Sequence, residues 1–69
     1  MQRRALESSS LASVGYDAEQ QILEVEFRNG RTYRYFDVPE LVHRRLLRAP
    51  SLGKFFNEAI RDQYRSERA

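Results

Sequence analysis

The sequence predicts an α+β domain in which a three-stranded antiparallel β-meander is followed by two α-helices packed on the sheet. Two segments, 22–27 and 32–36, alternate between apolar and polar side chains on either side of an Asn-Gly pair, which is typical of a β-hairpin. Residues 39–48 and 52–65 then repeat apolar side chains at helical spacing. Strands followed by helices indicate an α+β class.

The composition is that of one small folded domain. The chain has 69 residues, of which 41% are hydrophobic and 32% charged. A chain of this length buries only about 60% of the surface of its unfolded form, so its core is thin and a homo-oligomer or a bound partner would add stability.

Several classes of protein are excluded by what the sequence lacks. It has no cysteine and a single histidine, His43, which excludes a disulfide scaffold and a zinc-type metal site, and no cofactor motif is present. No apolar run approaches the roughly 20 residues that span a bilayer. We expect a cytoplasmic protein without a membrane contact.

The elements follow in order along the chain. Residues 1–10 contain three consecutive serines and little apolar content, and we expect a flexible arm there. A first strand is predicted over 11–16, the hairpin strands over 22–27 and 31–36, and a frayed tail over 66–69. The folded domain should therefore cover residues 11–65.

Two turns compete for the hairpin and set different registers. A two-residue turn would put Arg34 on the apolar face, whereas a three-residue turn with Gly30 as the bulge residue keeps Arg34 on the polar face. We choose the second turn, which pairs Val25 with Tyr33, Leu23 with Tyr35, and Glu24 with Arg34. Both tyrosines then lie on the apolar face, and Glu24 and Arg34 form an exposed ion pair.

Two prolines delimit the helices. Pro39 suits the first position of a helix, Pro50 ends that helix, and Ser51 can cap the next one. On the first helix the inward stripe is Val42, His43, Leu46 and Leu47, and the outward stripe is Leu41, Arg44, Arg45 and Arg48. On the second helix Leu52, Phe55, Phe56, Ala59, Ile60 and Tyr64 point inward.

The distinctive residues together form a pattern over about residues 9–64. Its pieces are Val14-Gly15-Tyr16-Asp17, Asn29-Gly30, Tyr33-Arg34-Tyr35, Val38-Pro39, the run from Ala49 to Asn57, and Ile60-Arg61 with Tyr64. This pattern resembles the KTSC domain, a bacterial module that also occurs at the C-terminal end of some lysyl-tRNA synthetases.

The resemblance implies a small α+β domain centred on the tyrosine-x-tyrosine strand, and an RNA-binding role through the synthetase association. Tyr33, Arg34 and Tyr35 are the family motif, and we interpret them as structural. His43 departs from the pattern, in which an aromatic residue such as tyrosine is expected.

Catalytic groups are scarce, and we predict that the protein is not an enzyme. His43 stands alone on an inward helix face, where a packed and hydrogen-bonded histidine is commoner than a general base. Glu24 and Glu26 lie on the outer face of a strand with arginine nearby and are interpreted as solvated, and N-capping explains Ser51.

The turn between the helices carries two interpretations. Ser51, Gly53 and Lys54 could hold a single phosphate at the helix N-terminus, where backbone N–H groups are free. The spacing is not that of a P-loop, and a tight junction between helices also explains the serine and the glycine.

Segregated charge is the strongest functional signal. Residues 41–56 include four basic residues and no acid, in a chain whose net charge is +2. The residues predicted to contact RNA are Arg44, Arg45, Arg48, Lys54 and Arg61. A solvated helix face is the plain alternative, and an acidic protein partner is the alternative function.

Overall fold

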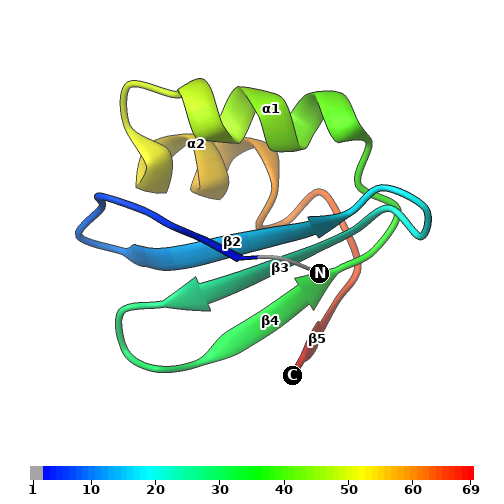
Figure 1. The fold of residues 1–69 in the computed structure, drawn as a ribbon, viewed down its shortest axis with the longest axis horizontal. Helices are drawn as coiled ribbons and strands as arrows, with labels where there is room; N and C mark the ends of the chain where they lie inside the picture. Colours follow the sequence, from blue (N-terminus) through cyan, green and yellow to red (C-terminus); the bar gives the residue numbers. More distant parts are fainter. Residues whose placement is uncertain (1–2) are drawn as a thin grey trace.

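A five-stranded antiparallel sheet with two helices on one face forms the domain (Figure 1). The structure is a computed structural model that describes residues 3–69. The strands are β1 (Arg3–Ala5), β2 (Leu11–Asp17), β3 (Ile22–Phe27), β4 (Thr32–Tyr35) and β5 (Ser66–Arg68), and the helices are α1 (Glu40–Arg48) and α2 (Leu52–Ala59). The strand order in the sheet is that of the chain, with both helices inserted between β4 and β5.

The α+β class is confirmed, and the three predicted strands are followed by the two predicted helices, but the predicted number of strands is wrong. The sequence predicted three strands, and β1 and β5 add one strand to each edge, inside the segments that we expected to be a flexible arm and a frayed tail. Both strands have three exposed residues, so neither shows the alternation by which a half-buried strand is recognised. The first two residues of the expected arm lie outside the described part of the chain.

The predicted hairpin register is confirmed at every pair. The structure pairs Leu23 with Tyr35, Glu24 with Arg34, and Val25 with Tyr33. Gly30 has a φ of 89°, a left-handed conformation that glycine adopts without steric cost. Its N–H donates to the Phe27 carbonyl at 3.0 Å, which closes the turn.

The first helix matches its predicted span within a residue, whereas the second is shorter than predicted. We expected a helix over 52–65, and α2 ends at Ala59. The N–H groups of Ile60 and Arg61 both donate to the Phe56 carbonyl, and Ile60 leaves the helical conformation with a φ of −122°. No glycine or proline marks this end. Ending there lets Ile60 enter the core and the chain return beside β4 as β5.

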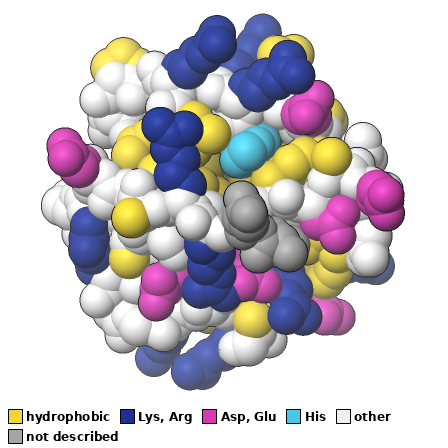
Figure 2. Space-filling model, in the orientation of Figure 1, with side chains coloured by type: hydrophobic (Ala, Val, Ile, Leu, Met, Phe, Trp, Pro, Cys, Tyr) yellow, Lys and Arg dark blue, Asp and Glu magenta, His cyan; other side chains and the backbone are white. Residues whose placement is uncertain are grey.

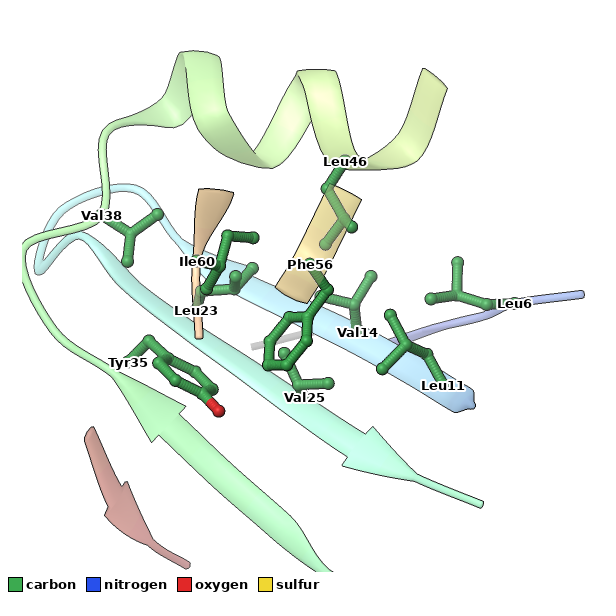
Figure 3. Close-up of a cluster of buried hydrophobic side chains, with 10 residues drawn as sticks. All are labelled: Leu6, Leu11, Val14, Leu23, Val25, Tyr35, Val38, Leu46, Phe56 and Ile60. Atoms are coloured by element: carbon green, nitrogen blue, oxygen red, sulfur yellow. The ribbon is translucent and has the colours of Figure 1, made fainter. Parts of the chain in front are cut away.

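The core lies between the helices and the upper face of the sheet (Figure 3). β3 and β4 contribute apolar side chains from alternate positions, β2 contributes Leu11 and Val14 on either side of a shift in its register, and each helix contributes one buried residue. The buried cluster comprises Leu6, Leu11, Val14, Leu23, Val25, Tyr35, Val38, Leu46, Phe56 and Ile60. The predicted inward stripes therefore pack against the predicted apolar face of the hairpin.

Glu24 lies on the opposite face of the sheet, and its predicted exposure is wrong. We expected a solvated carboxylate in an exposed pair with Arg34, but Glu24 is only 8% exposed. The pairing itself is present, since Arg34 Nε donates to Glu24 Oε2 at 2.9 Å. Arg3 on β1 donates to the other carboxylate oxygen. The edge strand, which the sequence did not reveal, brings Arg3 to this carboxylate and so explains the burial.

The charge of Glu24 is expected to stabilise the fold. Glu24→Gln should lower the free energy of unfolding by about 1–3 kcal/mol, because two guanidinium groups lose an ionic partner in a partly buried site. Urea denaturation measures the change. The control Glu19→Gln alters a carboxylate in an exposed turn and should stay within about 0.5 kcal/mol of the original protein. Equal effects of both substitutions would contradict the role of Glu24.

Because Gly30 has a left-handed conformation, replacing it with another residue is expected to destabilise the domain. Gly30→Ala should destabilise the domain by about 1–2 kcal/mol, because a Cβ disfavours a positive φ. No atom lies within 4 Å of the added Cβ, so steric contact makes no contribution. Gly30→Asn is the matched control and should lose less, since asparagine enters this region more readily. Thermal unfolding measures the change. If both variants unfolded at the same midpoint temperature as the original protein, the expectation would be contradicted.

Candidate functional site

Three arginines of α1 surround an apolar groove at the junction of the two helices. The groove has a volume of about 560 Å³ and is lined by Leu41, Arg44, Arg45, Arg48, Ala49, Pro50 and Phe55. We call it the α1–α2 groove. Leu41 is 55% exposed and the arginines are exposed too, as the helical spacing predicted. Figure 2 shows basic side chains gathered at the top of the molecule, where Figure 1 places α1.

The positive charge of the α1–α2 groove is largely uncompensated. Arg44 donates to Glu40 at 3.1 Å, an exposed pair one helical turn apart. Arg45 and Arg48 make no ion pair with any residue in the described part of the chain. Both lie in the last turn of α1, where a cation also stabilises the negative end of the helix dipole. The groove therefore combines exposed cations with an exposed apolar wall.

The structure does not bring all five predicted RNA-binding residues together. Lys54 lines a smaller hollow that shares Pro50 and Phe55 with the α1–α2 groove, so it adjoins the three arginines. Arg61 follows the end of α2 and lines a different groove with Tyr33 and Tyr35. Four of the five residues thus form one surface, and the fifth belongs to another.

The turn between the helices has a structural explanation for two of its residues. The Ser51 hydroxyl accepts a hydrogen bond from the Lys54 N–H at 3.4 Å, as an N-cap does. A Cβ on Gly53 would lie 3.2 Å from the Ser10 hydroxyl, so glycine permits the serine-rich segment to pack against α2. Binding of a phosphate by this turn stays a prediction.

The Tyr33-Arg34-Tyr35 strand divides its side chains between the two faces, as expected. Tyr35 is 4% exposed and meets Phe56 edge to face at 5.4 Å. Tyr33 is half-buried and meets Phe27 in the same way at 5.8 Å. Burial raises the pKa of Tyr35 above its ordinary value of 10.0, and this effect outweighs the opposing charge of Arg61. The contact of Tyr35 joins the sheet to α2, and that of Tyr33 joins two strands of the sheet.

His43 packs against an aromatic ring near the surface. Its imidazole stacks on Tyr16 with 4.7 Å between ring centroids and 14° between the planes. The Tyr16 hydroxyl donates to the Val38 carbonyl, which fixes that ring. The packed role is confirmed, but His43 forms no side-chain hydrogen bond among residues 3–69, contrary to our expectation. Figure 2 shows the histidine among hydrophobic side chains.

Two kinds of feature are absent from the described residues. Residues 3–69 contain no group of three or more acidic or histidine side chains that could hold a metal ion. Over the same residues, neither helix has the length and apolar character required to cross a membrane.

Known proteins resemble the chain along most of its length. The family model of the KTSC domain matches residues 7–64. An uncharacterized protein of Stutzerimonas stutzeri is 58% identical over 64 residues, which cover 93% of this chain and 90% of the relative. The crystal structure of a KTSC domain protein from Yersinia pestis superposes with a TM-score of 0.96 at 37% identity, covering 99% of this chain and 96% of that one.

A larger protein contains a related segment. A lysine–tRNA ligase of Nostoc punctiforme is 38% identical over 61 residues, which cover 88% of this chain but only 11% of the ligase. The chain therefore corresponds to a small part of that enzyme.

Stability should fall on acidification because of His43. Burial lowers the pKa of His43 below its ordinary value of 6.5. The charge of Glu40 opposes this shift, and the charges of Arg4 and Arg44 add to it. The folded state then binds fewer protons than the unfolded state, so this part of the stability is complete above pH 6.5 and is lost as the pH falls toward the folded pKa. Urea denaturation at pH 7.5 and pH 5 measures the loss.

A matched variant isolates the histidine in that experiment. His43→Phe keeps a ring against Tyr16 but cannot gain a proton, and it should lose less stability than the original protein over the same pH interval. Equal losses in both proteins would mean that carboxylates alone cause the pH dependence.

Proposed function

The chain belongs to the KTSC domain family, and on that premise we propose that it is a non-catalytic module that binds RNA through the α1–α2 groove and the adjoining Lys54. The observation that carries the proposal is the convergence of Arg44, Arg45 and Arg48 on one apolar groove. No acid lies between residues 41 and 56, so nothing within this stretch of the sequence neutralises the arginines.

Arginine suits this task physically. The planar guanidinium donates two parallel hydrogen bonds to a phosphate and stays charged at any physiological pH. Each phosphate that it neutralises releases condensed counterions, which favours binding most at low salt. Leu41 and Phe55 supply an apolar wall beside the cations, against which a ribose or base can pack.

The similarity to part of a lysine–tRNA ligase supports RNA as the ligand. That enzyme is named for an activity on tRNA, and the related segment accounts for 11% of its length. A segment of this size within a tRNA ligase is consistent with a role in contacting nucleic acid, and we extend that role to the present chain.

An acidic protein partner is the second candidate. The observation that favours it is the exposure of Leu41, because a large apolar side chain ringed by cations also fits a segment that carries leucine and glutamate. Salt dependence separates the two candidates. If the protein contacts phosphates, the logarithm of its binding constant for RNA falls steeply and linearly with the logarithm of the salt concentration. A titration of RNA binding at several salt concentrations measures this slope.

The RNA proposal is tested with the double variant Arg45→Gln/Arg48→Gln. These two arginines have no ion pair among the described residues, so their loss removes cations without freeing a carboxylate. The affinity for unfractionated bacterial tRNA should fall at least about tenfold at low salt, and the slope of log K against log salt should drop by about 1.4–1.8. Fluorescence anisotropy at several salt concentrations measures both quantities.

A charge-matched control distinguishes this groove from net charge. Ala18→Glu/Gln20→Glu changes the net charge by the same two units in the exposed turn between β2 and β3, away from the C-terminal end of α1 in Figure 1. This control should bind tRNA within about threefold of the original protein. Equal losses in the two double variants, or no tRNA binding by the original protein, would overturn the proposal.

A further inference from the structure

A second groove lies across α2 from the first and has an aromatic wall. It has a volume of about 580 Å³ and is built from the β3–β4 hairpin, the end of α2 and the segment that follows it. Four rings line it, those of Phe27, Tyr33, Tyr35 and Phe56. We call it the aromatic groove. Phe55 lines the α1–α2 groove and its neighbour Phe56 lines this one, so α2 separates the two.

The rings form a fixed surface because each is held by another. Phe27 meets Tyr33 at 77° and Phe56 at 74°, and Phe56 meets Tyr35 at 80°. Such edge-to-face pairs hold a ring in place. Tyr33 and Phe27 remain partly exposed. The wall is therefore preformed, and a planar ligand could pack on it without reorganising the core.

The tyrosine hydroxyls are available to a ligand. Among residues 3–69 neither Tyr33 nor Tyr35 uses its hydroxyl in a hydrogen bond. No buried side-chain polar atom in the described residues lacks a partner, so the Tyr35 hydroxyl reaches solvent although its ring is buried. Tyr35 is also one of the residues that line the aromatic groove.

The rim of the groove is basic and carries amide donors. Arg31 and Arg61 line it and form no ion pair within the described chain, and Asp62 is the single acid in the lining. Asn29 accepts the Arg31 N–H through its side-chain oxygen, which leaves its amide NH₂ group free to donate. An aromatic wall beside cations and amide donors matches three features of a nucleotide: the face of its base, its phosphate and the hydrogen-bonding edge of its base.

We propose that the aromatic groove holds one unpaired nucleotide of a single-stranded RNA, with its base against Tyr33 and Phe27 and its phosphate at Arg31 and Arg61. The inference rests on the proposed function and deepens it, because it names the form of RNA. Bases in a duplex are stacked on each other and present no free face to a side chain, so the rings select a single strand. The arginines of the α1–α2 groove are proposed to contact phosphates, which single and double strands share, so those contacts make no such selection.

The test uses an RNA oligonucleotide of 12 residues, made of uridylate with one central 2-aminopurine, and a 12-base-pair RNA duplex with the same fluorophore. The single strand should bind more tightly, and its 2-aminopurine emission should fall on binding because the base stacks on a ring. Tyr33→Leu should abolish the quenching and weaken binding at least about fivefold, whereas Tyr33→Phe keeps a ring and should stay within about twofold.

A second variant guards against misfolding of Tyr33→Leu, whose side chain is half-buried. Arg31→Gln/Arg61→Gln changes only exposed side chains and should weaken single-strand binding at least about fivefold. Nuclear magnetic resonance titration with uridine monophosphate should shift the signals of Tyr33 and Arg61 in the original protein. Equal binding of duplex and single strand, or wild-type affinity in both the Tyr33→Leu and the double arginine variants, would overturn the inference.

The two proposals fail in different ways. If Arg45→Gln/Arg48→Gln weakens binding while the aromatic-groove variants do not, RNA binding stands and the unpaired-nucleotide site is wrong. If the aromatic-groove variants weaken binding and the first pair does not, the unpaired-nucleotide site stands and the α1–α2 groove is not the contact surface. If the original protein binds neither oligonucleotide, both are wrong.

Discussion

The turn at Gly30 fixes which side chains of the hairpin face the helices, and the rest of the structure depends on that choice. Because side chains alternate along a strand, a shift of one residue would send Tyr33 and Tyr35 to the outer face and Arg34 into the core. Both turns require the left-handed conformation of Gly30, but a two-residue type I′ turn also requires a positive φ at Asn29, which Asn29 does not have, so the three-residue turn sets the register. The apolar layer under α2 and the aromatic wall beside it both follow from this one register.

The parts of the fold that could be predicted are those with local signals. Alternation along β3 and β4 and helical periodicity along α1 reveal which faces are buried, and prolines mark where helices start or stop. The edge strands could not be found in this way, because each has three exposed residues and exists only through pairing with a strand distant in sequence. The burial of Glu24 was missed for the same reason, since Arg3 reaches it from β1. The end of α2 carries no glycine or proline, and the return of the chain to β4 determines it.

The candidate sites also differ in how far local sequence patterns predict them. The convergence of three arginines on α1 follows from helical spacing and was predictable, but the separation of Arg61 from them depends on where α2 ends. Phe27 and Arg31 were not identified from the sequence, because the aromatic groove is assembled from the hairpin and from the end of α2, which lie about 30 residues apart. Sequence patterns therefore predict a surface made by a single helix or strand better than a surface that several elements share.

The two short edge strands also affect how the domain meets other molecules. An exposed sheet edge offers unpaired N–H and C=O groups that can pair with a strand of another chain, and long flat edges are a common cause of aggregation. Here the strands β1 and β5 flank the sheet with three residues each, and their side chains include Arg3, Arg4 and Arg68. β5 also carries Glu67, so the charge of the two edges is mixed, but edges of three residues give an incoming strand little to pair with. The two sheet edges are therefore poor sites for strand pairing with another chain.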